Sequence, residues 1–147
     1  MEYINSIGRR SGAVGIILIT AALAVVVNMI IYAIAKLAGA SFDFERGGEL
    51  YHVDPFTLAM FTALPMLIGL AITAIAARFG NWAYVVALIV GPVAAIGSTF
   101  IMTFPEDDLD TQSMVALAAS HVVLGIVIAI GVLALKASRS PQTPKFA

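Results

Sequence analysis

Residues 13–38 read AVGIILITAALAVVVNMIIYAIAKLA, an apolar run long enough to decide the fold class. Its polar interruptions are Thr20, Asn28, Tyr32 and Lys36. A helix needs about 20 mainly apolar residues to cross the hydrocarbon part of a bilayer. A cleaved signal peptide is the alternative, but a signal core spans only about 7–15 apolar residues. We therefore expect this run to form a retained transmembrane helix.

Further apolar runs follow at about residues 55–79, 82–104 and 111–135. Hydrophobic residues make up 61% of the chain and charged residues 12%, whereas a soluble domain has about 45–50% and about 25%. A soluble chain of this length would need more charge to cover its surface. The sequence therefore predicts an all-α integral membrane protein, a four-helix bundle whose spans run up, down, up and down.

The basic residues lie mainly on one side of the predicted bundle. Six of the eight are on the side of the termini: Arg9, Arg10, Arg78, Lys136, Arg139 and Lys145. The other side holds Lys36 and Arg46 together with eight of the nine acidic residues. Because Lys and Arg stay on the cytoplasmic side, we expect both termini to be cytoplasmic in a multi-pass protein of the plasma membrane.

These runs divide the chain into one membrane domain and its flanking segments. We expect a cytoplasmic N-terminus at 1–12, a single four-span domain at 13–137, outer loops at 39–54 and 105–110, and a flexible cytoplasmic tail at 138–147.

Local signals mark the ends of the spans. Pro55 suits the first position of a helix, and Asp108 or Asp110 is placed to cap the fourth span. Gly80 and Asn81 make the connection between the second and third spans very short. A turn this tight predicts that these two spans are antiparallel neighbours.

Asn28 and His121 are the polar residues deepest in the spans. Each lies ten residues from the outer end of its span, which is roughly 15 Å at about 1.5 Å per residue. Exposure to lipid is costly for both, so we expect His121 to face the interior within contact range of the first span near Asn28. One interpretation is structural, with hydrogen bonds to each other or to a backbone carbonyl. The other is a polar intramembrane site of Asn28, Tyr32, Ser120 and His121.

Two prolines and several small residues shape the predicted helix contacts. Pro65 and Pro92 lie inside the second and third spans, where each is a candidate helix kink. Small or weakly polar residues, Thr62 among them, recur at helical spacing and favour close packing of helices. Four short spans bury little surface by themselves. We therefore also expect a homo-oligomer or a place in a larger membrane complex.

Several chemistries lack the residues they need. The net charge of −1 gives no basis for binding nucleic acid, and the chain has no cysteine. No acidic residue lies within a span, and two histidines at different depths cannot ligate one haem. His52 beside Asp54 is either part of a cation site or, as in most such loops, simply solvated. We therefore predict no catalytic residue, no metal and no cofactor.

Three stretches resemble a known family. They are Asn28-x3-Tyr32-Ala33-Ile34 with Ala38-Gly39 and Phe42, the segment from Trp82 to Pro92, and Ser120-His121-Val122. Over about residues 13–135 the chain resembles an uncharacterised actinobacterial family of four-span membrane proteins, classed as a domain of unknown function. That resemblance implies a four-helix fold in the plasma membrane, and it implies no activity, substrate or catalytic residue.

Two functional hypotheses follow. The first is a non-enzymatic structural or accessory subunit, or a small homo-oligomer, embedded in the lipid bilayer. The alternative is a small transporter or ligand-binding membrane protein whose polar site lies around Asn28 and His121. An enzyme is the weaker interpretation, because no carboxylate partners His121 in the sequence pattern.

Overall fold

The computed structural model describes residues 2–46, 48–102 and 109–139. The elements in this part of the chain are α1 (Glu2–Leu37), β1 (Asp43–Arg46), β2 (Glu49–His52), α2 (Pro55–Ala76), α3 (Trp82–Met102) and α4 (Thr111–Arg139). Each of the four helices contains a segment long and apolar enough to cross a membrane. The predicted all-α, four-span fold class is therefore confirmed. The first two residues of the predicted tail at 138–147 belong to α4, which ends at Arg139. The rest of that tail and the outer loop at 105–108 lie outside the described residues.

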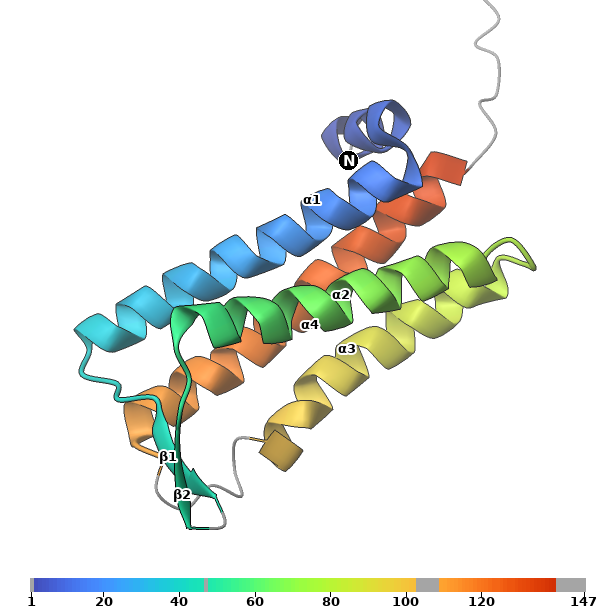
Figure 1. The fold of residues 1–147 in the computed structure, drawn as a ribbon. Coiled ribbons are helices and arrows are strands. Elements are labelled where there is room, and N and C mark those ends of the chain that lie inside the picture. The colour runs from blue at the N-terminus through green and yellow to red at the C-terminus, as the bar shows by residue number, and fades with distance from the viewer. Residues whose placement is uncertain (1, 47, 103–108, 140–147) are drawn as a thin grey trace, which may run out of the picture.

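The helices run alternately in opposite directions, and the β1–β2 hairpin sits at one end of the bundle (Figure 1). The first turns of α1, the α2–α3 turn and the end of α4 lie at the opposite end. In the described chain α4 packs extensively on α1 and α3, and α1 packs on α2, whereas α1 and α3 do not touch. The predicted α2–α3 neighbours share few contacts, because the two helices diverge from their short turn (Figure 1).

α1 is broken at Gly12. This residue has φ 62° and ψ 178°, a conformation that a residue with a side chain rarely adopts. The break sets the first turns at an angle to the rest of α1 (Figure 1). The segment that can cross a membrane therefore runs from Gly12 to Leu37.

Capping residues fix the ends of α2. The helix begins at Pro55, and the Asp54 carboxylate accepts a hydrogen bond from the backbone N–H of Thr57 at 2.6 Å. It ends at Ala76, three residues before the predicted end, because the N–H groups of Arg78 and Phe79 bond back to carbonyls three residues earlier and tighten the last turn.

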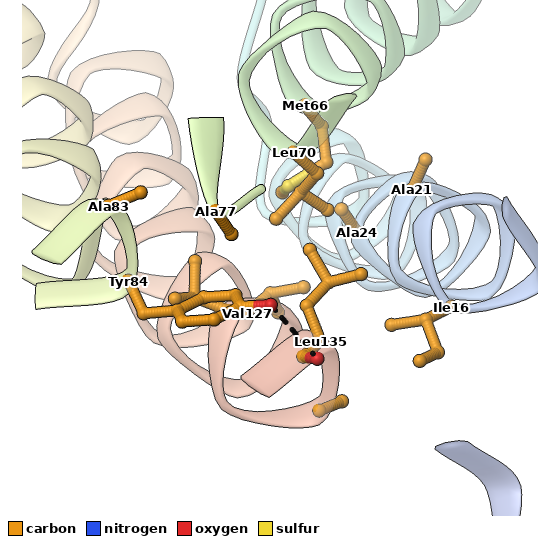
Figure 2. Close-up of a cluster of buried hydrophobic side chains, with 12 residues drawn as sticks. Ile16, Ala21, Ala24, Met66, Leu70, Ala77, Ala83, Tyr84, Val127 and Leu135 are labelled. Atoms are coloured by element: carbon orange, nitrogen blue, oxygen red, sulfur yellow. Dashed lines mark hydrogen bonds between the residues drawn. The ribbon is translucent and has the colours of Figure 1, made fainter. Parts of the chain in front are cut away.

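The larger buried cluster draws side chains from all four helices at the end of the bundle nearer the termini (Figure 2). Tyr84 of α3 is 1% exposed, and its hydroxyl donates a hydrogen bond of 3.5 Å to the Leu135 carbonyl of α4. Gly131 brings α4 close to its other neighbours. A Cβ added there would lie 2.7 Å from Thr20 Cγ2 and 3.3 Å from Leu70 Cδ1. The cluster therefore depends on a residue without a side chain at this point.

We expect the substitution Gly131→Ala to lower the free energy of unfolding. Overpacking costs about 1–3 kcal/mol, and the better helix propensity of alanine offsets about 1 kcal/mol of that cost. Gly97→Ala is the matched control, because nothing lies within 4 Å of its added Cβ. Thermal unfolding in detergent, followed by circular dichroism, measures both. A Gly131→Ala protein as stable as Gly97→Ala would contradict the packing described here.

Candidate functional site

Asn28 is buried where α1 meets α2. Its side chain is 1% exposed, and its amide Nδ2 donates a hydrogen bond of 2.9 Å to Thr62 Oγ1. Its Oδ1 is buried without a hydrogen-bond partner among the described residues. The predicted polar residue thus faces the interior, and its bonding partner is a threonine of α2.

His121 lies on a different side of the bundle from Asn28. Its Nδ1 is 2.7 Å from the carbonyl oxygen of Leu117, one turn earlier in α4. Gly125 and Ile128 share its helical face, and both pack on α3. His121 therefore turns toward α3, and no hydrogen bond joins it to Asn28 in the described chain. Of the two structural alternatives, His121 adopts the bond to a backbone carbonyl.

Ser120 faces a different neighbouring helix from His121, the next residue in sequence. Successive residues of a helix point about 100° apart, and Ser120 continues the buried face that holds Ser113 and Ala116. Ala116 belongs to the cluster that α4 shares with Tyr32 and Ala35 of α1. Ser120 is therefore on the α1 side of α4, with Asn28, whereas His121 is on the α3 side.

Thr99 of α3 completes a set of polar residues at one depth. It is 5% exposed, and its Oγ1 has no hydrogen-bond partner among the described residues. Ile96, one turn before Thr99, touches the site of Gly125, which is one turn after His121. Antiparallel α3 and α4 therefore place Thr99 and His121 at the same level.

We call Asn28, Thr62, Thr99, Ser120 and His121 the polar layer. Its members come from all four helices and carry only neutral hydrogen-bonding groups when His121 is unprotonated. Asn28 Oδ1 and Thr99 Oγ1 are the two buried side-chain N or O atoms without a partner in the described residues, and both belong to this layer. Within the described chain, two oxygen atoms of the layer therefore have unused hydrogen-bonding capacity.

Tyr32, the remaining predicted site residue, lies one turn outward from Asn28 and has an aromatic partner. Its ring stacks on that of Phe42 with centroids 4.5 Å apart and planes 23° apart. Phe42 is 1% exposed and packs with Leu58 and Ala116 as well. We call these four residues, Tyr32, Phe42, Leu58 and Ala116, the outer plug. They close the bundle at the end that carries the β1–β2 hairpin (Figure 1).

Backbone strain and hydrogen bonds hold Phe42 in place. Its φ of 60° is unusual for a bulky residue, and such conformations cost about 1–3 kcal/mol unless the surroundings impose them. The Phe42 N–H donates to Ser113 Oγ at 2.9 Å, and the Phe42 carbonyl accepts from the Val53 N–H at 2.9 Å. The Lys36 Nζ lies 6.0 Å from the ring centroid. Together these contacts turn the ring back into the bundle.

Asp110 connects the outer plug to the start of α4. Its carboxylate accepts hydrogen bonds from the N–H and Oγ of Ser113 and from the N–H and Oγ of Ser41. The predicted cap by Asp110 is confirmed. Partial burial raises the pKa of the Asp110 carboxyl, but the bonds from Ser113 and Ser41 outweigh burial and hold that pKa below its usual range.

The other residues singled out in the sequence are the prolines within α2 and α3 and the histidine of the hairpin. Pro65 and Pro92 lie within α2 and α3, and both helices continue through them. His52 pairs with Asp43 across the exposed hairpin through Nδ1 and Oδ1. Among the residues that the structure describes, no three His, Asp or Glu side chains gather as a metal site would require. His52 thus lies in an exposed hairpin and bonds Asp43, not its neighbour in sequence Asp54.

Sequence reasoning missed three contributors to the site. The sequence pattern placed Thr62 among the small residues that favour helix packing. Its spacing did not indicate the hydrogen bond to Asn28. Thr99 and the Phe42 plug were also missed, because both depend on how distant segments meet. Ser113, three residues after Asp110, was the one local signal, since capping residues bond the N–H group at that spacing.

We expect Asn28 and Thr62 to show coupled stabilities. A hydrogen bond between membrane helices contributes about 0.6 kcal/mol on average and up to about 1.7 kcal/mol. Asn28→Ala and Thr62→Val should therefore be non-additive by roughly that amount in a double-mutant cycle of unfolding free energies. Thr73→Val is the control, because the Thr73 hydroxyl bonds Gly69 O of its own helix. Additive effects of Asn28→Ala and Thr62→Val would disprove the bond.

We expect Asp110 to make stability depend on pH. Because its folded pKa lies below the unfolded value of about 3.9, its carboxylate stabilises the fold above that pH and loses this effect as pH falls toward the folded value. Asp110→Ala should lose about 1–2 kcal/mol at pH 7, as for a removed helix cap. Its deficit relative to the wild type should shrink below about pH 4. Thermal unfolding at pH 7 and pH 3 measures the difference, and a deficit that stays constant would contradict this role.

The comparison with known proteins identifies a family. No curated protein and no solved structure matches the chain significantly. Residues 8–138 match the model of a family described as a family of unknown function, DUF6069. This match takes in Asn28, the polar layer and the outer plug. The chain belongs to this family of unknown function.

Proposed function

We propose that this protein is a non-enzymatic structural or accessory subunit of the plasma membrane, acting as a small homo-oligomer or within a larger complex. The observation that carries the proposal is the sparse packing of α3. Only 17% of the membrane-spanning segment of α3 is buried inside the protein, whereas the figure for α4 is 33%. Helices in lipid associate through close packing, so a weakly packed helix offers surface for a further partner.

The exposed face of α2 supports the same proposal. A hollow of about 560 Å³ is lined by Met60, Phe61, Leu64, Pro65, Ile68 and Gly69. Gly69 is exposed, and nothing lies within 4 Å of a Cβ added to it. A glycine on the lipid-facing side of a helix lets another helix approach closely. We place a partner helix in this hollow of α2, and the exposed face of α3 is a second surface for a partner.

The orientation is part of the proposal. The six-to-two division of Lys and Arg supports a single domain at 13–137 with cytoplasmic termini and an outer hairpin. In the described chain, Lys136 and Arg139 lie in the last turn of α4, at the end opposite the hairpin. Cations there also suit the negative end of the helix dipole.

We expect native mass spectrometry from mild detergent to measure a complex heavier than the monomer. Because the chain has no cysteine, single-cysteine variants report contacts cleanly. Ile68→Cys lines the hollow and should form a disulfide between chains if the partner is a second copy. Val122→Cys, also exposed but on α4, is the control and should not. A strict monomer without any co-purifying protein would overturn the proposal.

We expect a membrane-impermeant maleimide to label the two ends of the bundle differently. Leu50→Cys, 77% exposed in the hairpin, should react in intact cells. Lys145→Cys should react only after the membrane is permeabilised, because the tail is proposed to be cytoplasmic. Labelling of Lys145→Cys in intact cells would reverse the orientation.

A further inference from the structure

Two buried oxygen atoms of the polar layer lack partners, and their surroundings differ. Asn28 Oδ1 belongs to a side chain that is 1% exposed and already bonded to Thr62. Thr99 Oγ1 is buried on α3, which packs mainly on α4, and the partly exposed His121 lies on α4 at the same level. In a bilayer no solvent compensates such an atom, so an unsatisfied hydroxyl is costly. On the Thr99 side of the layer, a hydroxyl without a partner and a partly exposed histidine lie at the same level of the bundle.

The hydrogen bond of His121 determines what its other nitrogen can do. A carbonyl oxygen only accepts, so the Nδ1 atom that faces Leu117 O carries a proton. In the neutral imidazole, Nε2 is then an acceptor. Thr99 offers a hydroxyl that both donates and accepts. No hydrogen bond joins these two groups directly in the described chain.

This pair of groups selects the chemistry of its ligand. A metal ion would need several His, Asp or Glu ligands, and among the described residues no three of these gather. An ammonium group would need a carboxylate, and α3 and α4 hold no Asp or Glu. An anion would meet the lone pair of Nε2. A neutral hydroxyl group fits both sites, because it donates to Nε2 and accepts from the Thr99 hydroxyl.

We propose that Thr99 and His121 form an intramembrane binding site for a neutral hydroxyl group, which bridges the two side chains between α3 and α4. The group belongs either to a water molecule or to an alcohol dissolved in the bilayer. The site is independent of the proposed assembly through α2. It also differs from the polar site predicted from sequence, because its second residue is Thr99 of α3 and Asn28 takes no part in it.

Nitrogen-15 NMR of histidine-labelled protein in lipid nanodiscs tests the site. His52→Gln removes the other histidine, which lies in the exposed hairpin, so that the remaining signals belong to His121. We expect a protonated Nδ1 and an Nε2 resonance shifted by an accepted hydrogen bond. Thr99→Val removes the hydroxyl at nearly constant volume and should displace the Nε2 resonance. Thr73→Val, a buried threonine bonded to its own helix, should leave it unchanged.

The same sample distinguishes the two sources of the hydroxyl. In deuterated lipid, magnetisation transfer from water to Thr99 and His121 identifies water as the bridging molecule. Transfer from added decanol, with loss of the water signal, identifies a membrane alcohol. An Nε2 resonance typical of an unbonded nitrogen, or one unaffected by Thr99→Val in a protein that still folds by circular dichroism, would overturn the proposal.

Discussion

The close approach of α4 to its neighbours is the contact on which the rest of the fold depends. At Gly131 the helix meets Thr20 of α1 and Leu70 of α2, and at Gly125 it meets α3 through Pro92. Lipid tails are as apolar as the side chains, so van der Waals packing of this kind replaces the hydrophobic drive of a soluble core. Since α1 and α3 do not touch in the described chain, α4 holds them in one bundle.

The same packing fixes the rotation of α4 and so divides the polar layer. Gly131 packs against α1 and α2, and Gly125 packs against α3. Because the rotation of α4 is fixed in this way, Ser120 and His121 must face different neighbouring helices. Ser120 is buried on the side of α4 that packs on α1, whereas the partly exposed His121 is on the side that packs on α3. On the α1 side of the polar layer, the bond from Asn28 to Thr62 joins two helices. On the α3 side, the Thr99 hydroxyl has no partner in the described chain.

The sequence predicted which residues form the spans but not how each helix is rotated about its axis. Apolar run length places the spans, and counting from their ends put Asn28 and His121 near mid-membrane. Of the two predicted bonding alternatives, His121 has the bond to a backbone carbonyl and Asn28 bonds Thr62. The sequence could not decide between these alternatives, because a one-residue step turns a side chain by about 100° and the neighbouring helix is set by tertiary packing. The Asp110 cap could be predicted, since it is local. The Phe42 plug could not, because it joins segments that lie some 70 residues apart.

The hairpin end and α3 are attached to the bundle in different ways. Phe42, Ser113 and Asp110 join the hairpin to α1 and α4 through hydrogen bonds that water and lipid cannot easily replace. α3, in contrast, is held mainly by its packing on one helix. Local openings follow the regions with the fewest buried contacts. Any motion of α3 relative to the α1–α4 pair would therefore act directly on the interface that contains Thr99 and His121.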